Sequence, residues 1–369
     1  MKLLYISSVN PLVKSGYYNA VTDRLSELRK DNDITLEALN YSQHKTSSPF
    51  SINIHKPWFL FQKGPIKYLE NLYLYNRIIR ALKKVKPDVV HVHWCYPIGY
   101  CTVKACKALD IPCVLTSHGS DIHSNPLKSR YIYSKTTWTL SNVSSNIFVS
   151  SALQEQAHKI CKSLSASYTI PNAIDTRKID SITNIPKGKT DNKTREILYI
   201  GNLNTTKGAD LLPEIFSKLK ETFAPEKLNF TIAGNGPLYD TIKNELIHKK
   251  IAANMLGHVS RDNSLQLIYS SDLVVIPSRH EGFGIVALEA FLAKTPCVGF
   301  KIPGFDNVFQ GNENLLVKLL SLDDFVSKSV SILNKNEIIN YSRYRTDYDI
   351  SNTIKNEIKI YHMLTNQPQ

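Results

Sequence analysis

Short runs of β-forming apolar residues alternate with helical stretches through most of this chain, and no other feature of the sequence restricts its fold as strongly. In the first half, the runs that favour strands lie at 3–6, 34–39, 89–92, 112–116 and 146–150. In the second half, they lie at 197–200, 229–233, 273–276 and 297–300. Strands separated by helices form parallel sheets that are covered by helices on both faces. The sequence therefore predicts an α/β fold.

Two domains are expected, because 369 residues are more than one ordinary hydrophobic core holds. Residues 181–195 are polar, contain proline and glycine and lack periodicity, so we interpret them as a linker. This places an N-terminal domain at 1–180 and a C-terminal domain at 196–344. Apolar residues at helical spacing near the C-terminus predict a last helix, at about 345–365, that packs back on the first domain.

The beginning of the chain and its cysteines favour a cytoplasmic protein. Lys2 leads directly into the first expected strand, so no signal peptide is indicated. No apolar stretch reaches the roughly 18–20 residues that span a bilayer. The six cysteines form no Cys-x-x-Cys pair, and such cysteines are usually small apolar core residues in a reducing compartment. We expect neither a disulfide framework nor a metal site from them.

The positive charge of the chain comes from its first half. Residues 1–190 contain 25 Lys and Arg against 12 Asp and Glu, whereas residues 191–369 contain 20 of each. The net charge of +13 therefore arises entirely before residue 191. Such asymmetry indicates that the first half faces something anionic, and nucleic acid, phospholipid and a phosphate-bearing substrate all fit this description.

The segment 41–87 concentrates this charge, with nine Lys and Arg, one acid and eight aromatic residues. Apolar residues recur in it at helical spacing, namely Ile66, Leu69, Leu72, Ile79 and Leu82. An ordinary helix that packs this stripe on the sheet accounts for the pattern. So does a peripheral membrane surface, in which Trp58, Phe59 and Phe61 enter the headgroup region and cations meet anionic lipid. Nucleic acid is not expected as a partner, because no nucleic-acid-binding motif accompanies the charge.

Residues 277–290 (PSRHEGFGIVALEA) carry the strongest functional signal. A buried strand ends just before them, and the loop opens a helix at about residue 285. Gly282 and Gly284 let the backbone approach a ligand, and the amides at the helix start can bind an anion. Glu289 lies more than one turn inside the helix and points back toward its start. Glu281 can therefore accept hydrogen bonds from sugar hydroxyls, and Glu289 from the two hydroxyls of a ribose.

This stretch, with its Glu-x₇-Glu spacing, resembles the signature of the retaining GT-B glycosyltransferases of family 4, the group 1 glycosyl transferases. Three further segments are similar to family motifs and follow in the expected order: 199–208 (YIGNLNTTKG), 233–237 (AGNGP) and 256–260 (LGHVS). The resemblance extends over nearly the whole chain and is densest from 197 to 305.

The resemblance implies a GT-B fold, in which two Rossmann-like domains face each other across a cleft and the second holds a nucleoside-diphosphate sugar. It implies retention at the anomeric carbon and no metal or other cofactor. The donor-binding residues that it implies are Glu289, Gly282, Phe283, Gly284, Ile285, Asn202, Gly234, Asn235, Gly236 and Gly16.

Lys207 is assigned to the leaving diphosphate, because a positioned ammonium stabilises charge that develops as the glycosidic bond breaks. Glu281, Lys207 and His118 are the expected catalytic residues. The sequence departs from the family at Asn202, where the family commonly has Arg. An amide cannot supply that charge, and Arg261 and Arg279 are candidates to replace it.

In the first half, the loop 11–17 lies between the first strand and a helix expected from about residue 18. Gly16 resembles the family's glycine loop, and Ser15 and Tyr17 beside it are expected to bind the acceptor; a plain turn explains the loop equally well. His118 follows another strand, at the edge where open α/β sheets bind ligands. By resemblance, His118 contacts the transferred sugar and Asp121 binds a hydroxyl or the acceptor.

Two metal-dependent alternatives are rejected. Zinc would need three or four of His91, His93, His118 and His123 to converge, which their spacing does not require. His91 or His93 is expected to be structural. A GT-A fold would need an Asp-x-Asp site after a strand, and 31–33 and 347–349 have that spelling only in polar, poorly placed segments.

The sequence predicts a retaining transfer of sugar to a hydroxyl of a glycan or lipid-linked acceptor, in the synthesis of a cell-surface polysaccharide or glycolipid. The basic, aromatic first half favours an acceptor at the inner face of a membrane. Two alternatives stay open: a GT-B epimerase that consumes the donor without an acceptor, and a non-catalytic protein that binds sugar nucleotides.

Overall fold

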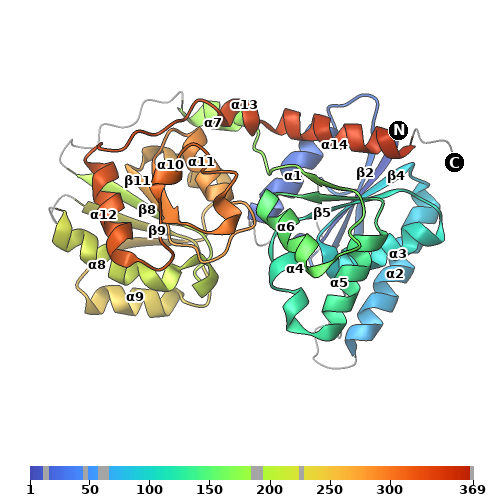
Figure 1. The fold of residues 1–369 in the computed structure, drawn as a ribbon, viewed down its shortest axis with the longest axis horizontal. Coiled ribbons are helices and arrows are strands. Elements are labelled where there is room, and N and C mark those ends of the chain that lie inside the picture. Colours follow the sequence, from blue (N-terminus) through green and yellow to red (C-terminus); the bar gives the residue numbers. More distant parts are fainter. Residues whose placement is uncertain (11–15, 45–48, 57–65, 184–193, 224–227, 366–369) are drawn as a thin grey trace. The chain divides into compact units, whose positions relative to one another are not determined.

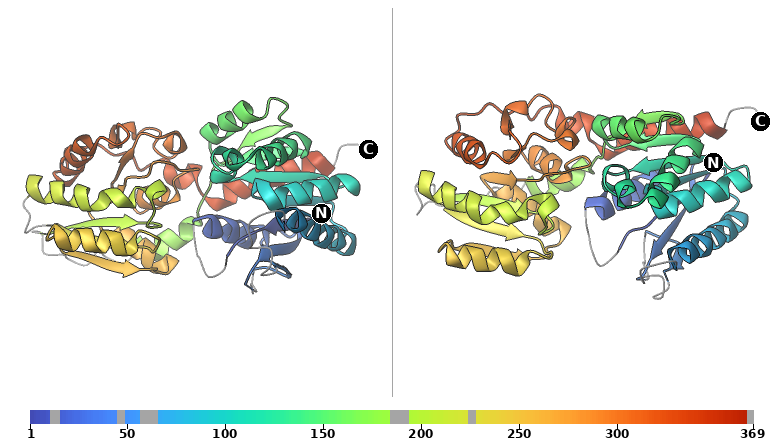
Figure 2. Two further views of the ribbon diagram at one scale, coloured as in Figure 1. Left: turned by 90° about the horizontal axis from the view of Figure 1, so that it is seen from below. Right: turned by 60° about the horizontal axis from the view of Figure 1, so that its bottom comes forward.

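The computed structural model describes residues 1–10, 16–44, 49–56, 66–183, 194–223 and 228–365. The chain forms two compact units, one made of Met1–Ile174 with Ile350–Gln369 and the other of Asp175–Asp349. Each unit is built on one parallel sheet, and both views of Figure 2 show helices on either side of each sheet.

The first unit contains a sheet of seven parallel strands in the order β3-β2-β1-β4-β5-β6-β7. The strands are β1 (Lys2–Ser7), β2 (Thr35–Ser42), β3 (Ile52–His55), β4 (Val89–His93), β5 (Cys113–Ser117), β6 (Ser145–Phe148) and β7 (Ser167–Thr169). The inner strands β1, β4 and β5 are buried along almost their whole length. Helices cover both faces of this sheet, which explains why these strands are runs of apolar residues rather than alternating patterns.

The helices of the first unit are α1 (Gly16–Leu28), α2 (Ile66–Val85), α3 (Tyr100–Ala108), α4 (Ser120–His123), α5 (Arg130–Asn142), α6 (Ser151–Ile160) and α14 (Ile350–Thr365). In Figure 1, α2, α3 and α5 pack side by side on one face of the sheet, and α14 lies against α1 on the other. Serine side chains fix some helix starts: Ser129 caps α5 and Ser150 caps α6, each accepting a backbone N–H of the first turn.

The last helix, α14, is part of the first unit's core. Its residues Ile350, Ile354, Ile360 and Tyr361 are buried with residues of β1, β4 and α1. The predicted return of the C-terminal helix to the first domain is confirmed.

The second unit contains six parallel strands in the order β10-β9-β8-β11-β12-β13. The strands are β8 (Arg195–Ile200), β9 (Leu228–Ala233), β10 (Ala253–Gly257), β11 (Leu273–Ile276), β12 (Cys297–Phe300) and β13 (Leu316–Val317). The helices are α7 (Thr176–Thr183), α8 (Leu212–Thr222), α9 (Tyr239–His248), α10 (Arg261–Ser270), α11 (Ile285–Leu292), α12 (Leu322–Leu333) and α13 (Tyr344–Asp347). In this arrangement, α8 packs with α9 and α12, and α10 with α7 and α11.

All nine predicted strands are present, and the described residues contain four others that were missed. The missed strands, β3, β7, β10 and β13, are the outermost strands of the two sheets. An edge strand is short and half exposed, so it lacks the continuous apolar run by which the inner strands were identified. In β10, for example, none of the residues is buried.

The chain passes between the units at 174/175 and 349/350, whereas the sequence placed the ends of its domains at 180 and 344. Ile350 donates its backbone N–H to the carbonyl oxygen of Ile174 (3.0 Å), so the two crossing points lie together. The helix α7 belongs to the second unit and takes up the first part of the predicted linker, of which residues 184–193 lie outside the described residues.

The exposed side of α2 differs from what its predicted apolar stripe suggested. The helix buries Asn71, Leu74, Ile78, Leu82 and Val85, whereas Leu69 and Leu72 are 54% and 58% exposed. The helix therefore has apolar residues on two sides: Leu82 of the predicted stripe is buried, whereas Leu69 and Leu72 of the same stripe are exposed. Trp58, Phe59 and Phe61 of the same segment lie outside the described residues.

Among the described residues, no helix is long and apolar enough to cross a membrane. All six cysteines are buried, and none of them forms a disulfide.

Candidate active site

The predicted site of the second unit lies where the strand order reverses. Strands β8 and β11 are neighbours in the centre of the sheet, and β9 and β12 continue it in opposite directions. In open α/β sheets, ligands bind beyond the carboxyl ends of the strands at this switch point. Lys207 follows β8 and Glu281 follows β11, so the fold itself brings these two predicted residues together.

Lys207 and Glu281 form an ion pair. The Nζ atom of Lys207 donates to Oε2 of Glu281 over 2.6 Å, and the hydroxyl of Ser278 donates to Oε1 over 2.8 Å. The Lys207 side chain is 32% exposed and that of Glu281 12% exposed. The lysine is therefore a cation that solvent and ligands can reach, and its partner is held in place by a second hydrogen bond. Ser278 lies inside the sequence motif, but its role was not predicted.

Hydrogen bonds join the loop that carries Lys207 to the loop that carries Glu281. The guanidinium of Arg279 binds Asp210 through two hydrogen bonds of 2.7 Å and also donates to the carbonyl oxygen of Thr205. The Arg279 backbone N–H donates to the carbonyl oxygen of Thr206 (2.9 Å). Arg279 thus positions this loop, which argues against the prediction that it replaces the missing arginine at 202.

The helix α11 begins directly behind this ion pair. Gly284 caps it with φ of 90°, a left-handed conformation that favours glycine. Phe283 is buried, while Gly282 and Ile285 are partly exposed at the helix start. The first backbone N–H groups of α11 have no partners within the helix and present a partial positive charge. This end of the helix suits an anion, and the binding of one there stays a prediction.

Glu289 lies inside α11 and is only 4% exposed. Its Oε1 atom is 3.7 Å from Nη2 of Arg261, the first residue of α10. Of the two arginines proposed to replace the missing cation, Arg261 is the one placed beside a predicted donor-binding residue. The role of Glu289 toward a ribose stays a prediction.

Replacing Gly284 by alanine should lower the free energy of unfolding of the second unit by about 2–4 kcal/mol. The new side chain would be strained by the left-handed backbone and would overpack its surroundings. A Cβ atom at this position would lie 2.6 Å from Cε1 of Phe305. The matched control is Gly311→Ala, where φ is also positive (81°) but no atom lies within 4 Å of the new Cβ. In this control, the free energy of unfolding should fall by only roughly 1–2 kcal/mol. Urea denaturation of the two variants measures the difference, and equal losses would contradict the proposed clash.

The loop after β9 packs against the loop after β8. Leu203 donates its N–H to the carbonyl oxygen of Asn235 (3.0 Å), and Gly234 donates to that of Gly257 (2.7 Å). A Cβ atom on Gly236 would meet the carbonyl oxygen of Leu203 at 2.5 Å, so this close approach requires glycine. The side chains of Asn202 and Asn235 are exposed at this edge of the sheet. A ligand can therefore reach both, and their contact with a donor stays a prediction.

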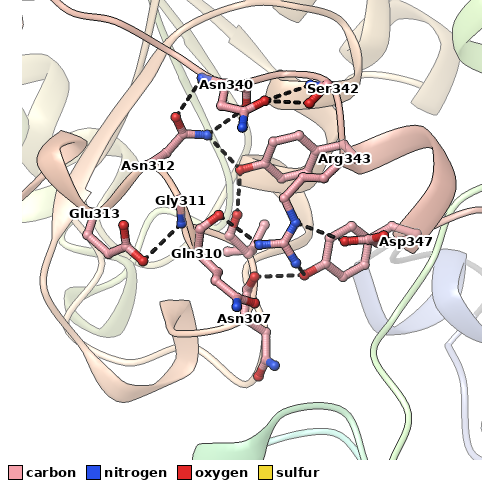
Figure 3. Close-up of polar contacts among 12 residues, drawn as sticks. Asn307, Gln310, Gly311, Asn312, Glu313, Asn340, Ser342, Arg343 and Asp347 are labelled. Carbon is pink, nitrogen blue, oxygen red and sulfur yellow. Dashed lines mark hydrogen bonds and ion pairs between the residues drawn. The ribbon is translucent and has the colours of Figure 1, made fainter.

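A polar cluster secures the segment that follows β12 (Figure 3). The buried amide of Asn312 donates to the carbonyl oxygen of Asn340 (2.8 Å) and to the hydroxyl of Tyr344 (2.9 Å), and it accepts the N–H of Asn340. Arg343 donates to the carbonyl oxygen of Gln310 (2.7 Å). These contacts join the end of the second unit to the loop at 303–313.

The segments that this cluster joins also pack against the loop of the candidate site. Gly304 of that loop packs so closely on the backbone of Glu281 that a Cβ atom would meet its carbonyl oxygen. The ring of Tyr348 contacts that of Phe283, with centroids 5.7 Å apart. No sequence signal pointed to these residues, because each acts through a partner that is distant in the chain.

In the first unit, His118 follows β5 in a loop that Asp121 organises. The carboxylate of Asp121 accepts the backbone N–H groups of Cys95 (3.2 Å), His118 (3.0 Å) and Gly119 (2.8 Å). Burial raises the pKa of Asp121 to about 6, although these N–H groups lower it. The residue is 1% exposed. In place of the predicted contact with an acceptor, the structure gives Asp121 the role of holding the loop that carries His118.

Tyr17 and Gly16 lie at the start of α1. The ring of Tyr17 contacts that of His118, with centroids 4.8 Å apart, and that of Trp94 at 5.2 Å. Tyr17 therefore lies beside His118, and its contact with an acceptor stays a prediction. Gly16 is exposed, and Ser15 lies outside the described residues.

Both histidines of β4 are buried. His91 bonds to the hydroxyl of Tyr361 (2.6 Å) and to that of Thr116 (2.7 Å), so it is structural. His93 bonds instead to His118, which no sequence feature indicated. In the part of the chain that the structure describes, no three His, Cys, Asp or Glu side chains are grouped so that they could hold a metal ion.

Comparison with known families accounts for both units. The family described as Glycosyltransferase Family 4 matches residues 21–178, and the family described as Glycosyl transferases group 1 matches residues 180–348. The second match contains both loops of the candidate site, and the first contains the His118 loop.

Individual proteins are similar over the same range. An uncharacterized glycosyltransferase of Methanocaldococcus jannaschii is 25% identical over 341 residues, 91% of each chain. An N-acetyl-alpha-D-glucosaminyl L-malate synthase of Bacillus anthracis is 26% identical over 307 residues, 79% of this chain and 78% of the relative. Among solved structures, a pneumococcal O-GlcNAc transferase in complex with UDP and GlcNAc matches with a TM-score of 0.75 and 13% identity, covering 100% of this chain and 99% of that one.

The fold, the loops at the switch point and these similarities agree. The chain belongs to family 4 of the glycosyltransferases and has the GT-B fold.

Proposed function

We propose that this glycosyltransferase takes a sugar from a nucleoside-diphosphate sugar and transfers it to an acceptor hydroxyl with retention at the anomeric carbon. The observation that carries the proposal is the Lys207–Glu281 ion pair at the switch point, directly before the start of α11. A cation, a helix N-terminus and a carboxylate at one place suit the diphosphate and the hydroxyls of one ligand. That a solved structure of the same fold holds UDP and GlcNAc supports this ligand class.

In the proposed reaction, the bond between the anomeric carbon and the phosphate oxygen breaks, and the acceptor oxygen attacks from the same face. The acceptor proton passes to the departing phosphate oxygen, so no protein nucleophile is needed. Lys207 and the N–H groups of α11 stabilise the charge that develops on the leaving diphosphate. Glu281 orients the sugar through its hydroxyls, which is a positioning effect.

The test has two stages. A panel of nucleoside-diphosphate sugars is first screened for a rise in melting temperature, since a ligand that binds only the folded state stabilises it. The stabilising donor is then incubated with candidate acceptors, and nucleotide release and the anomeric configuration of the product are measured. Release that depends on the acceptor supports transfer, and Glu281→Ala should abolish it while the protein stays folded. Release without an acceptor would indicate the epimerase alternative, and binding without turnover a non-catalytic protein.

We propose further that the acceptor is a glycan or lipid-linked hydroxyl presented at an anionic membrane surface. The support comes from α2, where Leu69, Leu72, Arg80 and Lys83 lie on one exposed side of the helix. There is no acid between residues 71 and 87. Exposed leucines beside a cluster of cations are typical of interfacial helices.

The neighbouring helices extend this surface. Beside α2, the rings of Tyr100 in α3 and Tyr131 in α5 are joined by Lys135, whose Nζ atom lies 4.8 and 5.4 Å from their centroids. Just before α5, Leu127 is 72% exposed. An exposed leucine and partly exposed aromatic rings beside a lysine fit the headgroup region of a membrane.

The protein should float with vesicles that contain anionic phospholipid and should be released by salt. Lys83→Gln/Lys84→Gln should weaken binding about thirtyfold, since each cation near the surface contributes about 1 kcal/mol. The matched control is Lys243→Gln/Lys318→Gln, which removes two exposed lysines of the second unit and should leave flotation unchanged. A protein that stays in the soluble fraction at low salt would contradict the membrane proposal.

A further inference from the structure

A hydrogen bond between two histidine rings fixes the orientation of His118. Nδ1 of the buried His93 lies 2.8 Å from Nε2 of His118, and the two ring centroids are 5.1 Å apart. The rings of Tyr5 and His91 also pack against His93 in tilted arrangements, each with a centroid distance of 4.4 Å. His93 is thus immobilised by packing. No hydrogen bond joins the other ring nitrogen of His118, Nδ1, to another described residue, so Nδ1 is the atom left for a ligand.

Both rings are neutral near neutral pH. Burial lowers the pKa of His93 well below its usual range, and the neighbouring His91, His118 and Arg24 lower it further. The pKa of His118 is lowered in the same way, mainly by burial. A neutral imidazole carries one proton, so a single proton lies between the two rings. Its position decides whether His118 offers a donor or an acceptor to a ligand.

The surroundings of His93 decide where this proton lies. Its Nε2 atom is buried and has no hydrogen-bond partner among the described residues. If His93 accepted the bond from His118, its own proton would be on Nε2, as a buried and unpaired N–H. Nearby, the Tyr5 hydroxyl and Nη2 of Arg24 are already buried donors that lack a described partner. In these surroundings, a lone pair on Nε2 costs less than a further N–H would, because the positive charge of Arg24 acts on His93 and the Tyr5 ring contacts it.

We propose that His93 is a positioning residue for His118: it donates its Nδ1–H to Nε2 of His118 and thereby holds the proton of His118 on Nδ1. His118 is then a hydrogen-bond donor toward an oxygen of the substrate. The statement about the substrate rests on the proposed function, whereas the position of the proton is a property of the free protein.

The proton position can be read directly from the free protein. In long-range ¹H–¹⁵N spectra of histidine-labelled protein, assigned by the loss of signals in His118→Asn, His118 should show a protonated Nδ1 and an unprotonated Nε2. In His93→Leu, which removes the donor, this preference should be lost. His93→Asn should retain it, because the amide nitrogen can take the place of Nδ1–H. A His118 ring protonated on Nε2 in the wild-type protein would overturn the proposal even if no variant folded.

Rate measurements on variants distinguish whether His93 positions His118 or only stabilises the fold. His93→Leu should lower kcat/KM for transfer about tenfold, the effect of one hydrogen bond, while the affinity for the nucleoside diphosphate stays unchanged. His93→Asn should restore most of the rate. The matched control is Tyr361→Phe, which removes a buried hydroxyl bonded to His91 rather than to His118; it should lower stability without moving the tautomer or kcat/KM.

The two proposals can fail separately. If His118 carries its proton on Nδ1 but no sugar nucleotide is turned over with any acceptor, the proposed function fails and the positioning of His118 stands. If transfer occurs and His93→Asn is as slow as His93→Leu, the proposed function stands and the role of His93 is refuted.

Discussion

Lys207→Ala should lower kcat for glycosyl transfer by about 10²–10³-fold, or roughly 3–4 kcal/mol of transition-state stabilisation. The lysine ammonium lies at the switch point of the second sheet, 2.6 Å from the carboxylate of Glu281. Negative charge on the leaving diphosphate grows as the glycosidic bond breaks, so a cation there acts mainly in the transition state. Steady-state rates of nucleotide release with the cognate donor and acceptor measure the loss.

The control for this prediction is Lys243→Ala, which removes an exposed lysine of α9 in the same unit. It should leave kcat and KM unchanged. The Lys207–Glu281 pair is partly exposed, and such pairs contribute little to stability. Lys207→Ala should therefore keep the wild-type melting temperature within a few degrees. Normal turnover in this variant would move the role to another cation, of which Arg261 beside Glu289 is the best placed.

Arg24→Met should lower the free energy of unfolding by about 3–5 kcal/mol, because it leaves the carboxylate of Glu357 buried without its partner. The Nε atom of Arg24 donates to Oε1 of Glu357 over 2.9 Å, and both side chains are fully buried. Arg24 also donates to Oδ1 of Asn172 over 3.0 Å. It therefore joins α1 to α14 and to the segment before the first crossing point. Chemical denaturation measures the loss.

The double variant Arg24→Met/Glu357→Leu separates the cost of an unpaired charge from the value of the pair itself. Since well-packed apolar side chains can replace a buried ion pair at little cost, the double variant should recover most of the lost stability. A double variant as unstable as the sum of the two single ones would show that the groups do not interact. A loss below about 1 kcal/mol in Arg24→Met would contradict the burial of the pair.

The sequence alone determined the local features of this protein. Strands buried on both faces are continuous apolar runs, so the inner strands and the two-unit α/β architecture were predictable. The sequence around Glu281, Gly282 and Gly284 also predicted a loop that opens a helix. The mistakes arose where the local signal is weak, as in the edge strands, or ambiguous, as in α2, whose two apolar stripes have the same spacing.

Only the tertiary structure decided which residues meet. Lys207 and Glu281 are 74 residues apart in the chain, and Arg24 and Glu357 are 333 apart. Their pairing depends on the strand order and on which side chains of α1 and α14 meet, neither of which the period of a sequence encodes. The same holds for Asp121, which looked like a ligand residue and instead binds three backbone N–H groups. Periodicity and turn chemistry report interactions between residues that are close in the chain. The contacts named above form only after each sheet has assembled and excluded water.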